Sequence, residues 1–308
     1  MMKHYSVLKN EVIEGLNINP DGIYVDATLG YGGHSEEILK RLRRGFLFAF
    51  DQDEDAISFG QERLSKVSNN FKIIYANFSN LKAKLYDEKI TKVDGVVFDL
   101  GLSSPQIDEI SRGFTFMHDA PLDMRMDKNN KLSAWEVINK YKLEDLINIF
   151  FTYGEERYSK SIAKNIVKER QNKKITRTTE LVNIIKYSVP LKYFLKNHPE
   201  RQIFQAIRIE VNNELNILKN TLKDVIDILN PKGRICIITF HSLEDRIVKH
   251  IFKKESDINN LVKGLPIIPE EYQPLIKLIN KKPILPSEEE LKVNTRSKSA
   301  KLRIIERL

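Results

Sequence analysis

Four segments of the sequence hold residue types that bind ligands or move protons, and each follows an apolar run typical of a buried strand. They are the glycine-rich segment 26–34 (Asp-Ala-Thr-Leu-Gly-Tyr-Gly-Gly-His), Asp51, Phe78, and segment 99–106 (Asp-Leu-Gly-Leu-Ser-Ser-Pro-Gln). Ligands of open α/β sheets bind beyond the carboxyl ends of the strands. We therefore expect these segments to meet at one edge of a sheet.

The first three segments have the chemistry of a nucleoside pocket. Small residues in segment 26–34 let backbone N–H groups approach a ligand. Asp51 can accept hydrogen bonds from a ribose diol, or it can cap the following helix, where Asp53 is also available. Phe78 can flank an adenine ring, with core packing as the alternative. The third glycine of a dinucleotide fingerprint would fall at Ser35 and is missing, which argues against an NAD-dependent oxidoreductase.

Segment 99–106 combines a carboxylate, two hydroxyls, an amide and a proline-restricted turn. Amino-group methyltransferases place a short polar motif with proline after this strand. Hydrogen-bond acceptors there draw the N–H groups of an exocyclic amine out of conjugation, and alignment with the methyl donor supplies much of the remaining rate. Asp99, Ser103 and Ser104 are the candidates for this role, although the usual aromatic residue after a double proline is absent.

The order of the apolar runs predicts the elements that position these segments. Strands that alternate with helices, each strand a continuous apolar run, indicate a parallel sheet covered on both faces. The predicted strands span 23–28, 46–50, 71–75, 93–98, 234–239 and 301–308. The predicted helices of the sheet span 36–44, 54–66, 213–229 and 242–252, the last opened by capping-box spacing from Ser242 to Asp245. The proline-rich stretch 267–290 is predicted to loop around a short strand.

A helical stretch interrupts this alternation, since residues 132–199 show helical patterns and almost no strand signal. We predict an α/β fold made of one sheet with an inserted helical domain. The predicted boundaries are 1–110 for the first segment of the core, 111–205 for the insert and 206–308 for the second segment of the core.

The charge of the chain is concentrated in that insert. The 308 residues carry 50 Lys and Arg against 42 Asp and Glu, a net charge of +8, while residues 130–200 alone hold 14 basic and eight acidic residues. A general lysine surplus from an AT-rich genome would spread along the whole chain. The concentration favours a surface for the phosphates of a nucleic acid.

Composition also excludes several classes of protein. Hydrophobic residues make up 41% and charged residues 30%, which excludes wholesale disorder and disulfide-stapled scaffolds. The single cysteine, Cys236, lies in an apolar run and is predicted to be a buried small hydrophobe. No apolar stretch approaches the ~18 residues of a membrane helix, and residues 1–10 lack a signal-peptide core. These features predict a protein without a membrane anchor, in the cytoplasm.

Three further residues are candidates for contacts with the substrate. His241 follows a predicted strand and can face a target base, or serve as a turn histidine bonded to backbone. Arg112 and Arg125 lie in a stretch rich in Phe and Met, which we interpret as a loop over the active site. Arg125 is a candidate phosphate contact, with a structural pair to Asp123 as the alternative. The histidines show no metal-ligand spacing, so no metal site is predicted.

Taken together, these segments resemble the RsmH (MraW) family of bacterial methyltransferases, which modify N4 of a cytosine in 16S ribosomal RNA. The resemblance covers nearly the whole chain and is carried by long matches in order. They include Gly30-Tyr-Gly-Gly-His-Ser35, Asp99-Leu-Gly-Leu-Ser-Ser-Pro-Gln106, Pro121-Leu-Asp-Met-Arg-Met-Asp127, Phe204-Gln-Ala-Ile-Arg-Ile-Glu-Val-Asn212 and Thr239-Phe-His-Ser-Leu-Glu-Asp-Arg246. Further matches lie at 4–8, 21–26, 112–116 and 295–303.

The resemblance implies a class I (Rossmann-like) fold, S-adenosyl-L-methionine as cofactor, and an inserted helical domain that helps to bind RNA. The implied substrate is a decoding-centre (P-site) cytosine of 16S rRNA in the small ribosomal subunit. The implied cofactor residues are Gly32, Gly33 and His34 at the methionine and ribose portion, Asp51 at the ribose hydroxyls, Phe78 by the adenine, and Asp99 and Gln106 completing the pocket.

Other functions and the assembly of the protein stay open at this point. One alternative is an RNA-binding assembly factor without catalysis, which a measured affinity for the cofactor would separate from an enzyme. Another is an amino-methyltransferase that acts on a different nucleic acid. The sequence leaves the oligomeric state open, a dimer included.

Overall fold

The computed structural model describes residues 6–258, 269 and 272–308. It divides the chain into two units, one made of 1–101 and 215–308 and the other of 102–214. The unit boundaries differ from the predicted ones by nine residues at each end. At the second junction the boundaries differ because a continuous helix spans the predicted boundary.

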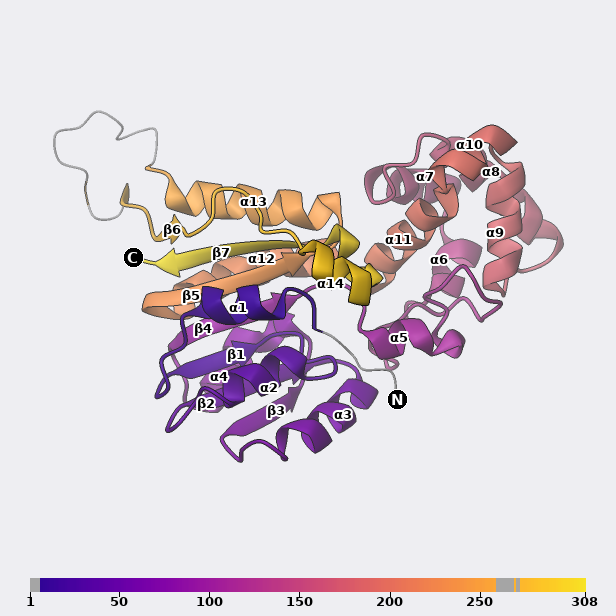
Figure 1. Ribbon diagram of the computed structural model, residues 1–308. Coiled ribbons are helices and arrows are strands. Elements are labelled where there is room, and N and C mark those ends of the chain that lie inside the picture. The colour runs from indigo at the N-terminus through magenta and orange to yellow at the C-terminus, as the bar shows by residue number, and fades with distance from the viewer. Residues whose placement is uncertain (1–5, 259–268, 270–271) are drawn as a thin grey trace. The chain divides into compact units, whose positions relative to one another are not determined.

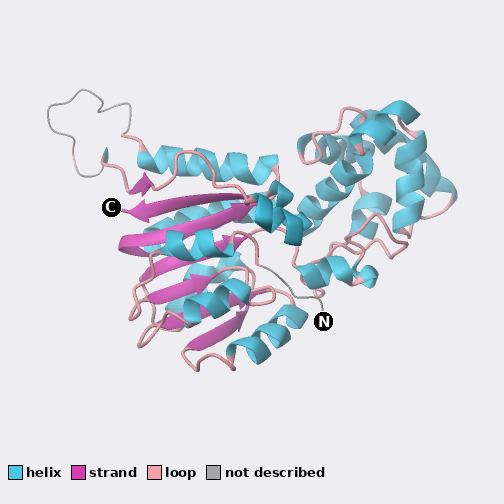
Figure 2. Ribbon diagram, viewed as in Figure 1, coloured by secondary structure: helices cyan, strands magenta, loops and turns pink. Residues whose placement is uncertain are grey.

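The first unit is built on one sheet of seven strands in the order β3-β2-β1-β4-β5-β7-β6 (Figures 1 and 2). The strands are β1 (Ile23–Asp26), β2 (Phe46–Asp51), β3 (Phe71–Tyr75), β4 (Val93–Asp99), β5 (Leu229–Thr239), β6 (Ile276–Leu278) and β7 (Lys301–Arg307). The first five are parallel to one another, and β7 runs antiparallel to both β5 and β6. The predicted α/β class is confirmed, since five of the seven strands form a parallel sheet.

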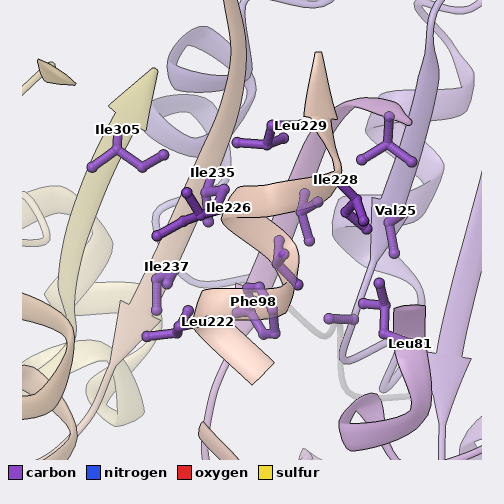
Figure 3. Packing of buried hydrophobic residues seen from close by; sticks show 14 of the residues in the cluster. Val25, Leu81, Phe98, Leu222, Ile226, Ile228, Leu229, Ile235, Ile237 and Ile305 are labelled. Carbon is purple, nitrogen blue, oxygen red and sulfur yellow. The ribbon is translucent and has the colours of Figure 1, made fainter. Parts of the chain in front are cut away.

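Helices pack on both faces of this sheet because its strands are apolar on both sides. One face is covered by α1 (Lys9–Leu16), α2 (Gly33–Leu39) and α3 (Glu54–Leu64), and the other by α4 (Leu81–Asp87), α12 (Glu214–Ile228) and α13 (Ser242–Ser256). Successive residues of β4 point to opposite sides, so Phe98 joins the second layer and Val97 the first. Figure 3 shows this second layer, in which Leu222 and Ile226 of α12 pack near Phe98, Ile235 and Ile237.

The second unit consists of helices around its own apolar core. They are α5 (Ser104–Asp108), α6 (Ala134–Lys140), α7 (Leu143–Thr152), α8 (Ser159–Asn172), α9 (Thr178–Tyr187), α10 (Leu191–Asn197) and α11 (Pro199–Asn212), with a short 3-10 turn at Ile110–Arg112. Helix α11 is continuous, and its buried residues Ile203, Phe204 and Ile207 all belong to this core. The predicted boundary at 205/206 cuts through that helix and is wrong for this reason.

Several local predictions are also corrected. Strand β5 begins at Leu229, five residues before the predicted start, because Leu229 pairs with Val93 ahead of an irregularity in the ladder. The capping box of α13 is formed one residue earlier than predicted, with His241 and Glu244 in place of Ser242 and Asp245.

Cys236 is fully buried, as predicted. The short strand expected within 267–290 is β6, while residues 267, 268, 270 and 271 of that stretch lie outside the described residues. The remaining elements are α14 (Glu288–Val293) and two 3-10 turns, Phe78–Asn80 and Thr295–Ser299. Among the described residues, no helix is long and apolar enough to cross a membrane.

Candidate active site

The carboxyl ends of four parallel strands hold the residues that the sequence singles out in the first unit. Asp26 ends β1, Asp51 ends β2 and Asp99 ends β4, while Phe78 follows β3 after a short turn. The strand order β3-β2-β1-β4 makes these ends neighbours. The first unit therefore carries a row of carboxylates along one edge of its sheet.

The glycine turn after β1 is held by Asp51, one carboxylate of this row. Gly30 and Gly32 have φ values of 50° and 72°, in the left-handed region that favours glycine. The backbone N–H of Gly30 donates to Asp51 Oδ2 at 2.9 Å. A Cβ atom on Gly33 would lie 1.8 Å from Ser6 Oγ, so a larger residue there would require the Ser6 side chain to move.

Asp51 has lone pairs left for a ligand. Its Oδ1 accepts a hydrogen bond from the N–H of Asp53 at 2.9 Å, and its Oδ2 accepts the bond from Gly30. Burial raises the pKa of Asp51 to about 6. The helix cap that the sequence offers as the alternative role belongs to Asp53, whose side chain accepts from the N–H of Asp55 at the start of α3.

Asp26, the first residue of segment 26–34, forms a buried network with its partners, and the sequence assigns it no separate role. Asp26 accepts hydrogen bonds from Ser35 Oγ at 2.7 Å and from the N–H of Thr28 at 3.1 Å. Burial raises its pKa to about 6. Ser35, where the dinucleotide fingerprint has its third glycine, thus holds the end of β1 to α2. The only sequence signal for this network is a polar residue at the end of an apolar strand.

Asp99 is the least satisfied carboxyl of the row. Its backbone N–H donates to Thr28 Oγ1 at 2.7 Å, which fixes the end of β4. Oδ1 is buried and has no hydrogen-bond partner among the described residues, while Oδ2 lies 3.7 Å from His34 Nδ1. Burial raises the pKa of Asp99 to about 8, and the charges of Asp26, Glu244 and Glu290 add to this effect.

Phe78 shows the core packing that the sequence offers as the alternative. Its ring meets Phe98 edge to face, with centroids 5.6 Å apart and planes at 89°. The ring is half-buried against the second layer of the sheet and keeps part of its surface accessible. A place beside an adenine therefore stays a prediction.

His241 lies at the start of α13, with a side chain that is 9% exposed. Its Nε2 is 3.1 Å from Glu244 Oε1, and the other oxygen of Glu244 accepts from the N–H groups of Phe240 and His241. The partner is thus a carboxylate of the same helix, where the alternative in the sequence was a backbone group. Contact with a target base stays a prediction.

Ser103, Ser104 and Gln106 belong to the helical unit. The side chain of Gln106 is buried and accepts the N–H of Ser103 at 3.1 Å, which holds the turn ahead of α5. Ser103 Oγ is buried without a hydrogen-bond partner in the part of the chain that is described. Ser104 is the first residue of α5. Their roles toward amine and cofactor stay predictions.

Arg112 and Arg125 organise the loop between α5 and α6. The buried guanidinium of Arg112 donates to the carbonyl oxygens of Arg125 and Met126 at 2.9 and 3.0 Å. Arg125 pairs with Asp123 through two bonds of 2.8 and 2.7 Å, as the structural alternative states. These bonds account for both arginines within the loop, and contacts of either with RNA stay predictions.

Asn212 completes that loop and is a residue that sequence reasoning missed. At the end of α11, its amide accepts the N–H of Met126 and donates to the carbonyl of Met124, each at 2.8 Å. The two partners lie more than 80 residues away along the chain, so no local sequence pattern predicts the contact.

The sheet is parallel, a glycine turn follows β1, and the carboxylate of Asp51 follows β2 with lone pairs left for a ligand. These features define a class of proteins that bind nucleoside cofactors at the strand ends. The comparisons narrow that class. The chain belongs to the MraW methylase family, whose model matches residues 1–308.

Relatives match over the full length as well. The chain is 52% identical to "Ribosomal RNA small subunit methyltransferase H" of Exiguobacterium sibiricum over 309 residues, covering 100% of this chain and 99% of the relative. It is 51% identical to the protein of the same name from Limosilactobacillus fermentum, covering 99% of this chain and 98% of the relative. The protein is thus a methyltransferase, and S-adenosylmethionine is its methyl donor.

The residues at the strand ends fit this donor, which carries a ribose diol and cationic groups. Asp51 offers its remaining lone pairs to the diol, and the glycine turn offers close backbone approach. The buried Oδ1 of Asp99, which lacks a hydrogen-bond partner among the residues described, lies near further carboxyls, where a positive charge is favoured. Asp51, Gly32, Gly33 and Asp99 would hold the donor within this unit.

Proposed function

We propose that the protein methylates N4 of a decoding-centre (P-site) cytosine in the 16S rRNA of the small ribosomal subunit. The support for an rRNA substrate is an identity of about one half, over the whole length, to proteins named ribosomal RNA small subunit methyltransferase H. The support for an amine as the acceptor is the chemistry at the end of β4.

One observation carries the assignment of an amine, namely the buried Oδ1 of Asp99, which has no hydrogen-bond partner within the described part of the chain. An amino group that conjugates with an aromatic ring is a poor nucleophile. A carboxylate that accepts one of its N–H groups localises the lone pair on nitrogen, and it does so most strongly in a dry site. Asp99 is the carboxyl of the row with an oxygen available for this bond.

The reaction needs few groups from the protein. The bound donor presents its methyl group on a sulfonium. The lone pair of the cytosine N4 attacks the methyl carbon, and the carbon–sulfur bond breaks with its electrons left on sulfur. Asp99 then takes a proton from N4, so that an O–H bond forms at Oδ1 and the nitrogen keeps the electron pair. Ser103 and Ser104, which follow Asp99 in the sequence, are the further candidates to hold the amine.

The helical unit is proposed to bind the RNA backbone. Lys160, Lys164 and Lys168 recur every four residues on the exposed face of α8, while Ile162 and Ile166 of the same helix are buried. Such a stripe is complementary to a row of phosphates. Because small ribosomal subunits are assembled in the cytoplasm, we place the protein there.

The deciding experiment is transfer of a tritiated methyl group to small ribosomal subunits from cells that lack this gene, followed by mass spectrometry of the nucleosides. We expect N4-methylcytosine at one site, and loss of transfer in Asp99→Asn. Asp87→Asn, at an exposed carboxyl of α4, is the matched control and keeps the wild-type rate. Absence of incorporation, or a different methylated nucleoside, would overturn the assignment. Calorimetry with S-adenosylmethionine separates an inactive enzyme from an RNA-binding factor without a cofactor.

A further inference from the structure

Helix α3 packs closely against the glycine turn that follows β1. The two meet at Gly60 and Leu29, both buried, and a Cβ atom on Gly60 would lie 2.6 Å from a methyl carbon of Leu29. A larger residue at 60 would require the Leu29 side chain to move. Arg63 follows three residues later on the same side of the helix, and its guanidinium reaches polar atoms of the turn.

The guanidinium of Arg63 connects the turn to α2. Its Nη1 donates to the carbonyl oxygen of Tyr31 at 3.1 Å, and its Nε donates to Glu36 Oε2. Both nitrogens belong to one rigid planar group, so the two acceptors are fixed relative to each other. Glu36 also pairs with Lys40 of the same helical segment, so its carboxylate has a second cation. What Arg63 adds is the bond to the turn itself.

That bond fixes one particular peptide group of the turn. The peptide group between Tyr31 and Gly32 is held at its oxygen by Arg63 and at its nitrogen by the carbonyl of Leu29, to which the N–H of Gly32 donates at 2.7 Å. Gly30 and Gly32, on either side of Tyr31, have positive φ values and little steric restriction. Without Arg63 this peptide group is therefore held on one side only.

We propose that Arg63 is a positioning residue for the methyl donor, which acts through the carbonyl of Tyr31 and keeps the glycine turn in the conformation that receives S-adenosylmethionine. The inference goes beyond the proposed function, because it concerns the donor and does not depend on which nucleoside is methylated. Arg63 acts without touching the donor. A turn that is ordered before binding loses less conformational freedom when the ligand arrives, and the affinity is higher for that reason.

Two substitutions at Arg63 separate its two bonds. Arg63→Met removes both. Arg63→Gln places an amide nitrogen near the position of Nε, so it keeps a donor for Glu36 and loses the bond to Tyr31. Calorimetry with S-adenosylmethionine should give a Kd about 10-fold higher than wild type in both variants, since both lose a charged hydrogen bond to the turn. Wild-type affinity in Arg63→Gln would overturn the inference.

Arg41 offers a matched control within the same unit. Its Nη1 donates to the carbonyl oxygen and to the carboxylate of Glu37 at 2.8 and 2.9 Å. These are the same two kinds of acceptor that Arg63 has, but both belong to Glu37 of α2 and neither belongs to the turn. Arg41→Met removes the same charge and should leave the affinity for the donor unchanged. An equal loss of affinity in Arg41→Met and Arg63→Met would show that only net charge matters, and would overturn the inference.

Hydrogen exchange tests the turn without any activity. In the free protein, the backbone amides of residues 29–33 should exchange faster in Arg63→Gln than in wild type, and at the wild-type rate in Arg41→Met. Saturating S-adenosylmethionine should remove most of this difference, because the bound donor orders the turn itself. Unchanged exchange in free Arg63→Gln, or a difference that persists with the donor bound, would overturn the inference.

Kinetics separate positioning from a general structural role. With small ribosomal subunits as acceptor, Arg63→Gln should raise KM for the donor by about 10-fold and keep kcat at saturating donor near the wild-type value. A lower kcat with an unchanged KM would overturn the inference. A wild-type protein that transfers no methyl group to these subunits would refute the proposed function, while calorimetry and exchange would still decide the role of Arg63.

Discussion

Replacing Asp99 by Asn is expected to stabilise the protein while it destroys the activity. Burial and the charges of Asp26, Glu244 and Glu290 raise the pKa of Asp99 to about 8, from 3.8 for an ordinary Asp. The folded protein thus holds a proton that the unfolded chain releases at much lower pH. An amide in this place has no charge to desolvate and no repulsion to overcome.

The sign and size of the effect follow from that difference. Below about pH 4 both states bind the proton, and Asp99 adds no pH dependence. Between about pH 4 and pH 8 the folded state binds more protons, so the free energy of unfolding falls as pH rises, by at most ~1.4 kcal/mol per pH unit. The upper limit of this total loss in the free energy of unfolding is about 6 kcal/mol, which is reached above pH 8. Because 27% of the side chain is exposed and water screens its neighbours, we expect ~1–3 kcal/mol for Asp99→Asn.

Urea unfolding of both proteins from pH 4 to pH 9 measures this directly. The difference in the free energy of unfolding between Asp99→Asn and wild type should grow until about pH 8. Asp51→Asn is the internal control, because the pKa of Asp51 is raised only to about 6 and its difference should stop growing there. If Asp99→Asn follows the wild type at every pH, Asp99 is ionised in the folded protein and the reasoning is refuted.

Three further predictions concern the cofactor, the RNA and the loop. Asp51→Ala should weaken binding of S-adenosylmethionine by about 10- to 100-fold through loss of the charge-assisted bonds to the diol, and calorimetry measures this. Lys164→Glu with Lys168→Glu should weaken RNA binding and flatten its dependence on salt, measured by titration at several salt concentrations. Arg112→Met should lower the free energy of unfolding by about 2–4 kcal/mol, measured by urea unfolding, because one buried and one partly buried carbonyl group lose their donor.

Each of these has a clear contrary outcome. Unchanged calorimetric affinity in Asp51→Ala removes Asp51 from the ribose site. Lys219→Glu with Lys223→Glu, on the exposed face of α12, is the charge-matched control for the helical unit, and an equal loss of RNA affinity there would mean that only net charge matters. Wild-type stability in Arg112→Met would argue that the guanidinium serves RNA and not the loop.

The strands and their ends were predictable because the physics that places them is local. Continuous apolar runs end in a polar residue where the chain leaves the sheet, so Asp51 and Asp99 mark two strand ends without any tertiary information. The first strand was predicted to run to Thr28, and it ends at Asp26 instead. The boundaries of the insert were not predictable in the same way. Helix α11 reads as one amphipathic run, and its membership of the helical core depends on contacts with distant residues.

Contacts across long stretches of chain decide the rest of the site. The bond from His34 to Val7 joins residues 27 positions apart, and that from Asn212 to Met124 joins residues 88 positions apart. Neither follows from composition or periodicity, since His and Asn have many other uses on a surface. Arg112 shows a second difficulty, because the sequence does not reveal that its Nη2 group donates to two carbonyl oxygens of the loop.

The cost of burying the carboxylates at the three strand ends indicates that a ligand binds there. Burial raises the pKa of Asp26, Asp51 and Asp99 alike, so each of them costs stability in its ionised form. Asp26 and Asp51 recover part of that cost through hydrogen bonds to both oxygens. Asp99 has no such bond at Oδ1 from any residue in the ranges 6–258, 269 and 272–308. Buried groups in this state are typical of sites where a bound molecule supplies the missing partner. In the proposed reaction a cationic methyl donor would supply the charge and the substrate amine would supply the N–H, so Asp99 is the residue at which this proposal sets stability against catalysis.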